Sequence, residues 1–420
     1  NLIDFVPPKT ALVIKADNFL DVRDELQKTQ WYQQNQNEKI ITEWQNDLQL
    51  LQNWPVQQAG FLSLTPIGKK ELALSFVTKG QPNKAIPLAD GEVLKRFDYN
   101  GQEIKEVKLK QNSYFYTRFK EVIVFSSSQL MIENGIRNIA SNLPANPGLA
   151  KSSKTTNKNL ALFINFDRKE QLFNYWLPDD VITDVEGFNQ WVSLDVNMNN
   201  DGLLLNGIIN NEMDSRASVF NTGKRHGVKI APANTLTYLS MNYPELDQKN
   251  ENQRRFPAYY DLIKLTDEFF KIRTTSSVLY GLHLKDAKKG IDYLKEVSAK
   301  DSTFRDKQIY KLNKSDILSD FKTIQTKKVN YFSQIADFVL FSDQVNALKN
   351  TIISYQNNSL LTSTPYVNLI DQNLTEEQNY FGLVNLEELS KTETGLIQPD
   401  LYNKIKDLNF NQAKLFSFQI

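Results

Sequence analysis

The sequence predicts an α+β protein made of two tandem copies of one module, with mainly antiparallel sheets and helices packed on one face. Two observations support this prediction: four stretches recur in the same order, and hairpin-like strands alternate with helical segments in both halves. The chain has 420 residues, which exceeds the roughly 250–300 residues at which a single hydrophobic core stops growing. More than one domain is therefore expected.

The duplication rests on pairs of matched stretches whose spacing is nearly constant. Pro7 matches Pro232 and Phe125 matches Phe341, so the offsets stay close to 220 residues. We predict a first copy at residues 1–215, a linker at 216–227 and a second copy at 228–420. The matched stretches are VPPKTALVIKA and APANTLTYLSM, YFYTRFKEVIVFSSSQL and NYFSQIADFVLFSDQV, NLALFINFDRKEQL and NYFGLVNLEELSK, and GFNQWVSLDVNM and NFNQAKLFSFQI.

The elements of the first copy follow from side-chain periodicity and from the residues that begin and end helices and strands. Asp17 or Asn18 can cap a helix containing Phe19, Val22 and Leu26, and Pro55 favours the end of a second helix. The sequence Asn199-Asn200-Asp201-Gly202 predicts a hairpin turn. The predicted strands are 10–16, 60–64, 71–78, 103–109, 114–119, 122–126, 160–166, 191–198 and 203–209; the predicted helices are 19–26, 38–54, 129–141 and 169–176; a polar loop is expected at 144–158.

The second copy follows the same plan with changes. The segment FPAYYDLIKLTDEFFKI, residues 256–272, carries aromatic residues at helical spacing, which predicts a core helix rather than a cofactor site. Residues 246–255, LDQKNENQRR, are interpreted as a solvated loop. The final stretch, NFNQAKLFSFQI, stops where the first copy continues through a turn into LLLNGII. We therefore expect at least one strand, and a further domain, beyond Ile420.

Composition excludes several classes of function. Lys and Arg total 49, as do Asp and Glu, so no overall charge attracts nucleic acid or an anionic membrane. The chain has no cysteine, which removes disulfides, thiolate metal sites and cysteine nucleophiles. No apolar run reaches the roughly 18 residues of a membrane-spanning helix. Membrane contact is expected only through an anchor outside this chain, upstream of Asn1.

The two histidines of the chain, His226 and His283, give no clear catalytic signal. The tripeptide Arg225-His226-Gly227 is the one that carries the phosphohistidine nucleophile in histidine phosphatases. That family needs it directly after a buried strand near the start of its domain, whereas here it lies between the two copies. His283 belongs to a strand-like segment. We interpret residues around His226 as a basic interdomain loop.

Two acidic segments were considered as cation sites. Asn197, Asn199 and Asp201 resemble the start of a calcium loop, but the position that requires a bidentate glutamate falls on Ile208. The hairpin turn explains these residues better. Asp179, Asp180, Asp184 and Glu186 form a local acidic cluster, for which a solvated loop or helix start is favoured over cation binding. We nominate no catalytic, cofactor-binding or metal-binding residue and expect no cofactor.

The repeated start, apolar-Pro-x-x-Thr followed by an extended apolar run and a polar helix, resembles exported proteins and lipoproteins of Bacteroidota that carry domains of unknown function. This resemblance extends to the module plan and to the Asn, Lys, Gln and Ile richness of the chain. It implies an exported protein, located in the periplasm or at the outer-membrane surface, and held by a lipid upstream of Asn1. It carries over no functional residue.

Two functions of different classes are compatible with these observations. The favoured one is a non-catalytic cell-envelope protein whose modules provide a scaffold or protein-binding surface, in a complex associated with the outer membrane. The alternative is a secreted or periplasmic hydrolase that uses a carboxylate pair between the modules. The partners expected for the favoured function are other envelope proteins.

Overall fold

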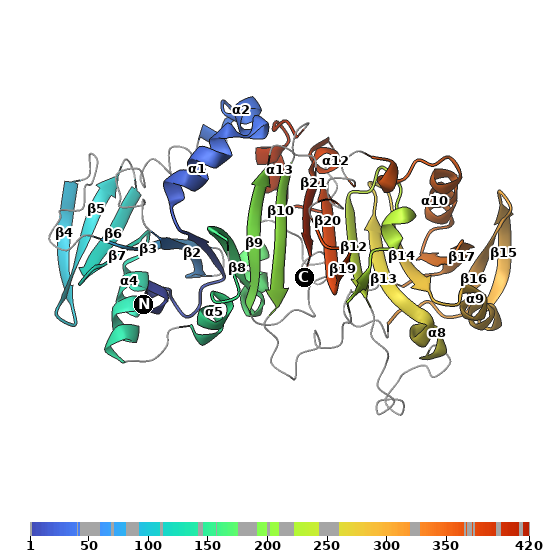
Figure 1. The fold of residues 1–420 in the computed structure, drawn as a ribbon, viewed down its shortest axis with the longest axis horizontal. Helices are drawn as coiled ribbons and strands as arrows, with labels where there is room; N and C mark the ends of the chain where they lie inside the picture. The colour runs from blue at the N-terminus through green and yellow to red at the C-terminus, as the bar shows by residue number, and fades with distance from the viewer. Residues whose placement is uncertain are drawn as a thin grey trace.

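The computed structural model describes residues 2–39, 41–42, 59–68, 71–80, 92–109, 112–141, 146–156, 158–174, 191–199, 202–209, 222–242, 260–319, 328–364, 367, 372, 374–391, 396–410 and 415–419. Within these residues the fold is α+β, and two similar modules are joined in one long sheet of 19 strands (Figure 1). A separate two-stranded sheet pairs β11 (Gly223–Lys224) with β19 (Glu377–Gln378).

The first copy contributes ten strands of the large sheet. Its strands are β1 (Leu12–Ala16), β2 (Gly60–Pro66), β3 (Leu72–Lys79), β4 (Glu92–Tyr99), β5 (Gln102–Leu109), β6 (Asn112–Phe119), β7 (Val122–Ser126), β8 (Leu160–Asn165), β9 (Trp191–Asn199) and β10 (Gly202–Ile209). Its helical segments are η1 (Leu2–Phe5), α1 (Phe19–Lys28), α2 (Gln30–Asn35), α4 (Gln129–Ala140), α5 (Pro147–Ser152), η2 (Phe166–Arg168) and α6 (Lys169–Phe173).

The second copy contributes nine strands of the large sheet. They are β12 (Thr237–Asn242), β13 (Thr266–Arg273), β14 (Val278–Leu284), β15 (Ser298–Phe304), β16 (Lys307–Leu312), β17 (Tyr331–Ile335), β18 (Phe338–Ser342), β20 (Tyr380–Asn385) and β21 (Leu415–Gln419). Its helical segments are η5 (Gly227–Lys229), α8 (Tyr260–Leu265), α9 (Ala287–Glu296), α10 (Val345–Gln356), η8 (Leu361–Ser363), α12 (Leu386–Lys391) and α13 (Pro399–Ile405).

The strand order confirms the duplication. From one end, the first copy reads β4-β5-β6-β7-β3-β2-β1-β8-β9-β10, and from the other end the second copy reads β15-β16-β17-β18-β14-β13-β12-β20-β21. Each strand from β1 to β9 thus has a counterpart at the same topological position, and all four matched sequence stretches fall on such counterparts. β10 is the additional strand of the first copy.

Equivalent side chains make equivalent contacts in the two copies. Ser126 donates its hydroxyl hydrogen to the carbonyl of Leu74, and Ser342 donates to the carbonyl of Val278, at 3.0 and 3.1 Å. Each serine also accepts a backbone N–H two residues later, immediately before α4 or α10. The matched Phe-Ser pairs therefore fix the start of a helix to the neighbouring strand in both modules.

The copies meet where β10 pairs with β21 in parallel, and the other pairings within the large sheet are antiparallel. The apolar core on one face of the sheet continues across this junction: Leu194 and Leu205 of the first copy belong to the same buried cluster as Met241 and Tyr380 of the second. β21 therefore has a neighbour on each side, β20 and β10. The expectation of a further strand and domain beyond Ile420 stays a prediction.

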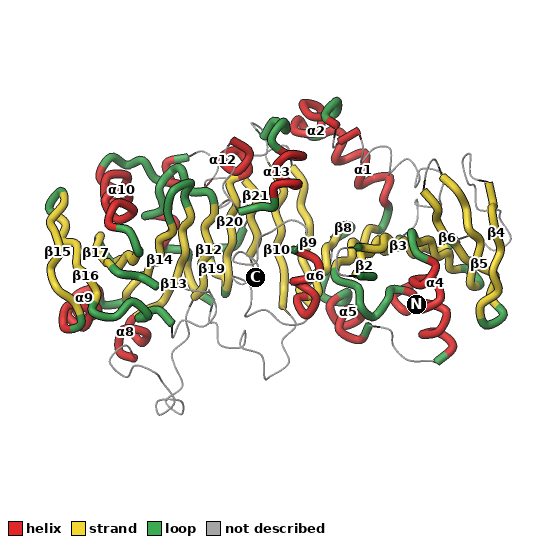
Figure 2. Tube along the Cα trace, turned by 180° about the vertical axis from the view of Figure 1, so that it is seen from behind, coloured by secondary structure: helices red, strands yellow, loops and turns green. Residues whose placement is uncertain are grey.

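A second connection is made by α2 of the first copy, which reaches over to the end of α13 (Figures 1 and 2). Asn35 is 1% exposed, and its side-chain amide donates to the carbonyl of Asn409 at 2.8 Å and accepts from its N–H at 2.6 Å. Tyr32 packs with Leu408 and Phe410 around this pair. The Asn35 amide thus bonds both the N–H and the carbonyl of Asn409.

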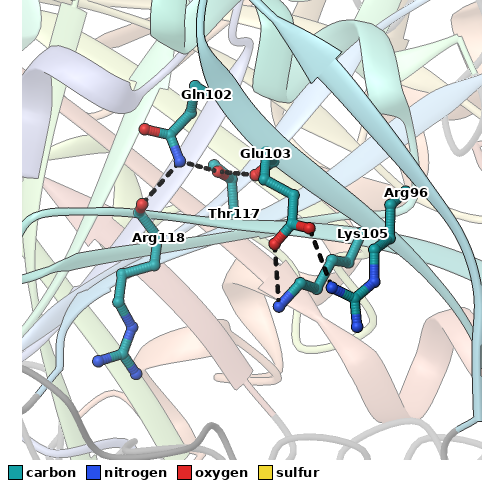
Figure 3. Close-up of polar contacts among 6 residues, drawn as sticks. All are labelled: Arg96, Gln102, Glu103, Lys105, Thr117 and Arg118. Atoms are coloured by element: carbon teal, nitrogen blue, oxygen red, sulfur yellow. Dashed lines mark hydrogen bonds and ion pairs between the residues drawn. The ribbon is translucent and has the colours of Figure 1, made fainter.

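The outermost described strands are β4 and β15, and both carry charges and a register irregularity, at Val93/Lys95 and Lys300/Ser302. Charges and bulges discourage further pairing at a sheet edge. On β5, the strand next to β4, Glu103 forms ion pairs with Lys105 of the same strand and with Arg96 of β4, at 3.1 and 3.2 Å (Figure 3). The hydrogen bond from Lys105 is the main reason that the pKa of Glu103 is lowered.

The helices lie on both faces of the sheet rather than on one as expected. Phe269 and Phe270 are neighbours on β13 and point to opposite faces, and they belong to different buried clusters. α9 packs with the Phe269 side through Ile291 and Leu294, whereas α10 packs with the Phe270 side. No described helix is long and apolar enough to cross a membrane.

The expected helix at 256–272 was wrong over its second half, because α8 ends at Leu265 and β13 begins at Thr266. Side chains of β13 are buried on both faces, so its sequence lacks the polar alternation that marks a half-exposed strand. Strand β4 was missed, and part of the polar loop expected at 144–158 forms α5. The expected helix at 38–54 falls largely outside the described residues, and the loop at 246–255 falls wholly outside them.

Replacing Asn35 with alanine should lower the free energy of unfolding by about 1–3 kcal/mol, because both backbone polar groups of Asn409 lose their partner. The measurement is urea-induced unfolding. Asn403→Ala is the control, because Asn403 is exposed and interacts only locally with Lys406 among the described contacts. Equal free energies for the two variants would contradict the role given to Asn35.

Candidate functional site

The two histidines of the chain lie in contact. His226 directly precedes η5, and His283 lies on β14, yet their rings stack with centroids 3.9 Å apart and planes 10° apart. The ring of Phe338, opposite His283 on β18, lies 5.0 Å from the His283 ring. Nothing in the sequence indicates that the two histidines meet. They are 57 positions apart, so only the pairing of the strands brings them together.

A β-bulge adds a carboxylate to the pair. The register of β13 against β14 shifts between Thr266 and Glu268, so Asp267 is the extra residue, and Glu268 lies opposite His283. Bulges re-aim side chains in this way. The Oδ1 atom of Asp267 lies 2.6 Å from Nδ1 of His283. His226, Asp267 and His283 each offer one ligand atom, and all three of these atoms lie within 4.8 Å of one another.

The loop that carries His226 is held to the sheet by a buried glutamate. Glu268 is fully buried; its Oε2 accepts the N–H of Gly227 and its Oε1 accepts the hydroxyl of Tyr238, each at 2.7 Å. Burial among apolar side chains raises the pKa of Glu268. A Cβ at position 227 would lie 2.5 Å from the Phe270 ring, so glycine allows the loop to come this close.

Arg225 fixes the other side of the same loop. Its Nη1 donates to the carbonyl of Thr375 and to Oε1 of Gln378, at 3.0 and 2.9 Å, and its guanidinium lies 4.9 Å from the centre of the Phe381 ring. The sequence interpretation of this segment as a basic interdomain loop was therefore incomplete, because it is anchored to the second copy. The guanidinium of Arg225 is thus engaged by Thr375, Gln378 and Phe381 of the second copy.

The surroundings of His226 favour its neutral form. Burial disfavours the imidazolium, and the neighbouring His283 adds repulsion, so the pKa of His226 is lowered. A neutral imidazole retains a nitrogen lone pair that can bind a metal ion. Two imidazoles and one carboxylate are a donor set suited to divalent transition metals. The histidine–aspartate cluster, defined as His226, Asp267 and His283, is therefore a candidate metal site that sequence reasoning missed.

The acidic segments considered from the sequence do not take part in this cluster as far as the structure describes them. Asp179, Asp180, Asp184 and Glu186 lie outside the described residues, as does Asp201. Asn197 lies on β9, and β9 and β10 form the predicted hairpin.

Comparison with known proteins supplies a family. A family model described as "Protein of unknown function (DUF3352)" matches residues 45–255. The chain belongs to the DUF3352 family. No curated protein matches it. Two solved structures of TP0453, in crystal forms I and III, align over 84% of this chain and 97% of their own, with 9% and 8% identity and TM-scores of 0.27 and 0.26.

Glu268→Gln should change the pH dependence of stability. Because the pKa of Glu268 is raised in the folded protein, the folded state holds more protons than the unfolded state once the pH exceeds 4.5. The free energy of unfolding of the unmodified protein therefore falls as the pH rises through this range, by about 1.4 kcal/mol per unit of pKa elevation. The glutamine variant lacks this loss, so its free energy of unfolding minus that of the unmodified protein should increase with pH.

The measurement is urea-induced unfolding at a series of pH values from 4 to about 8, with the two proteins compared at each. Glu376→Gln serves as the control, because Glu376 is exposed and pairs only with Lys224 among the described salt bridges. A difference between the Glu268→Gln variant and the unmodified protein that stays constant, or shrinks with pH, would refute the raised pKa.

Proposed function

We propose that this DUF3352 protein is a non-catalytic, exported cell-envelope protein that provides a scaffold or protein-binding surface, as part of a complex associated with the outer membrane. The proposed location rests on the resemblance of its repeated module starts to exported proteins and lipoproteins of Bacteroidota. The scaffold role rests on the way in which the two modules are joined.

The observation that carries the proposal is the double connection between the copies. The parallel pairing of β10 with β21 makes one sheet of two modules, and the shared apolar core stiffens it on one face. The contact of Asn35 with Asn409 adds a second attachment point away from the sheet. Two independent attachments oppose hinge motion between the modules, and a rigid elongated body suits a protein that positions others (Figure 2).

The alternative, a hydrolase with a carboxylate pair between the modules, has less support at the junction. One set of directly paired residues across the junction contains Asp195 on β9, Asn206 on β10 and Gln419 on β21. Among the described residues of this set there is one carboxylate, and its neighbours are amides. The buried carboxyl with a raised pKa, Glu268, lies on β13 within the second copy.

The proposal is tested by photo-crosslinking in native cells. A photoreactive amino acid is placed at Leu130 on α4, at Tyr355 on the equivalent helix α10, and at Ile208 on β10 near the junction, which are 49%, 37% and 52% exposed. We expect adducts in the envelope fraction in which positions from both modules reach the same partner complex.

Two results would count against the proposal. A protein that migrates at its own mass under native conditions, and forms no adduct at any of the three positions, is not a scaffold. Adducts that appear only outside the envelope fraction would reject the proposed location and leave the binding role.

A further inference from the structure

We infer that the histidine–aspartate cluster of the second copy binds one divalent transition-metal ion of the Zn²⁺ class. The inference goes beyond the scaffold role and does not depend on it. It rests on the convergence of three donor side chains from three separate segments at one half-exposed position: the loop before η5, the bulge of β13, and β14.

The donor set matches the preferences of such ions. Zn²⁺ binds imidazole nitrogen at about 2.0–2.1 Å and carboxylate oxygen at about 2.0–2.2 Å, usually with four ligands. Two histidines and one aspartate would supply three, leaving a position for water. The chain has no cysteine and only these two histidines, so it has no competing thiolate or imidazole site.

Two of the three donors are already in place. Asp267 and His283 lie on paired strands, and the distance of 2.6 Å between Oδ1 and Nδ1 is that of a shared proton. Two ligand atoms about 2 Å from an ion at a tetrahedral angle lie about 3.3 Å apart, so an ion that takes the place of this proton needs Oδ1 and Nδ1 to separate by roughly 0.7 Å. The ladder of β13 and β14 holds the rest of both residues in position.

The His226 ring must turn before all three donors can bind one ion. The stacked rings are nearly parallel, so one ion cannot lie in both ring planes until the His226 ring turns. The backbone below that ring is anchored by the Gly227–Glu268 hydrogen bond and by Arg225. Binding therefore requires rotation of one half-buried side chain while the loop stays where it is.

Charge around the site is compatible with a cation. Asp267 contributes a carboxylate at the surface of the cluster. Two lysines add positive charge near His226, the exposed Lys229 and Lys224, and Lys224 is paired with Glu376 at 3.1 Å, which partly offsets its charge. The Glu268 carboxyl lies beneath the loop as a hydrogen-bond acceptor rather than as a ligand.

The test uses Zn²⁺ itself and the full chain, with metal removed beforehand by a chelator. Isothermal titration calorimetry at neutral pH should give one ion per chain. His226→Ala and Asp267→Asn should each weaken binding by about tenfold or more. Asp292→Asn is the control and should bind as the unmodified protein does, because Asp292 is an exposed carboxylate on α9 that contacts Lys295.

A second readout follows the two imidazoles directly. With two histidines in the chain, the imidazole region of a ¹H–¹⁵N NMR spectrum should contain two ring systems, and both should shift together as one equivalent of Zn²⁺ is added. Zn²⁺ should also raise the midpoint of thermal unfolding of the unmodified protein but not of His226→Ala. Folding of each variant is checked by circular dichroism.

Several results would overturn the inference. They are the absence of Zn²⁺ binding, equal affinity in His226→Ala, Asp267→Asn and the unmodified protein, or imidazole signals that do not move when Zn²⁺ binds. If one variant fails to fold, the other variant and the NMR titration still decide between these outcomes.

Discussion

The need of each sheet edge for a partner shapes this structure more than any other constraint. The last strand of each copy, β10 or β21, would expose a row of backbone N–H and C=O groups, which is costly and invites aggregation. Pairing β10 with β21 satisfies both edges at once. β10 lies between β9 and β21, which occupy the same topological position in the two copies, and it runs antiparallel to β9 and parallel to β21.

The two copies differ at the positions of the candidate site. The hydrogen bonds of Ser126 and Ser342 align Leu74 on β3 with Val278 on β14. Counting five residues along each strand places Lys79 at the position of His283. The corresponding count on β2 and β13 places Ala59 at the position of Glu268. The first copy thus has lysine and alanine at the positions of His283 and Glu268, and both histidines of the chain belong to the segments around the second copy's site.

Local sequence signals predicted much of the fold. The cap at Asn18 and the hairpin turn between β9 and β10 were readable because each depends on residues close together in the chain. The matched Phe-Ser pairs were readable because the sequence of one copy could be compared with that of the other. The second half of 256–272 was read as helix because burial on both faces of β13 removes the alternation that identifies a strand. The candidate site was unreadable for a different reason. Its donors come from three segments, and the bulge that turns Asp267 toward His283 exists only in the paired strands.

Glu268 is the link between the stable core and the candidate site. A carboxyl buried among apolar side chains lowers stability unless its hydrogen bonds compensate, and an apolar residue of similar size usually serves a core as well or better. Here the alternative would leave the N–H of Gly227 without its acceptor, and the loop before η5 would lose its attachment to the sheet. The position of that loop relative to the sheet determines whether the His226 ring stacks on His283. The burial of Glu268 is therefore best explained by the position that it gives to His226, rather than by the stability of the module.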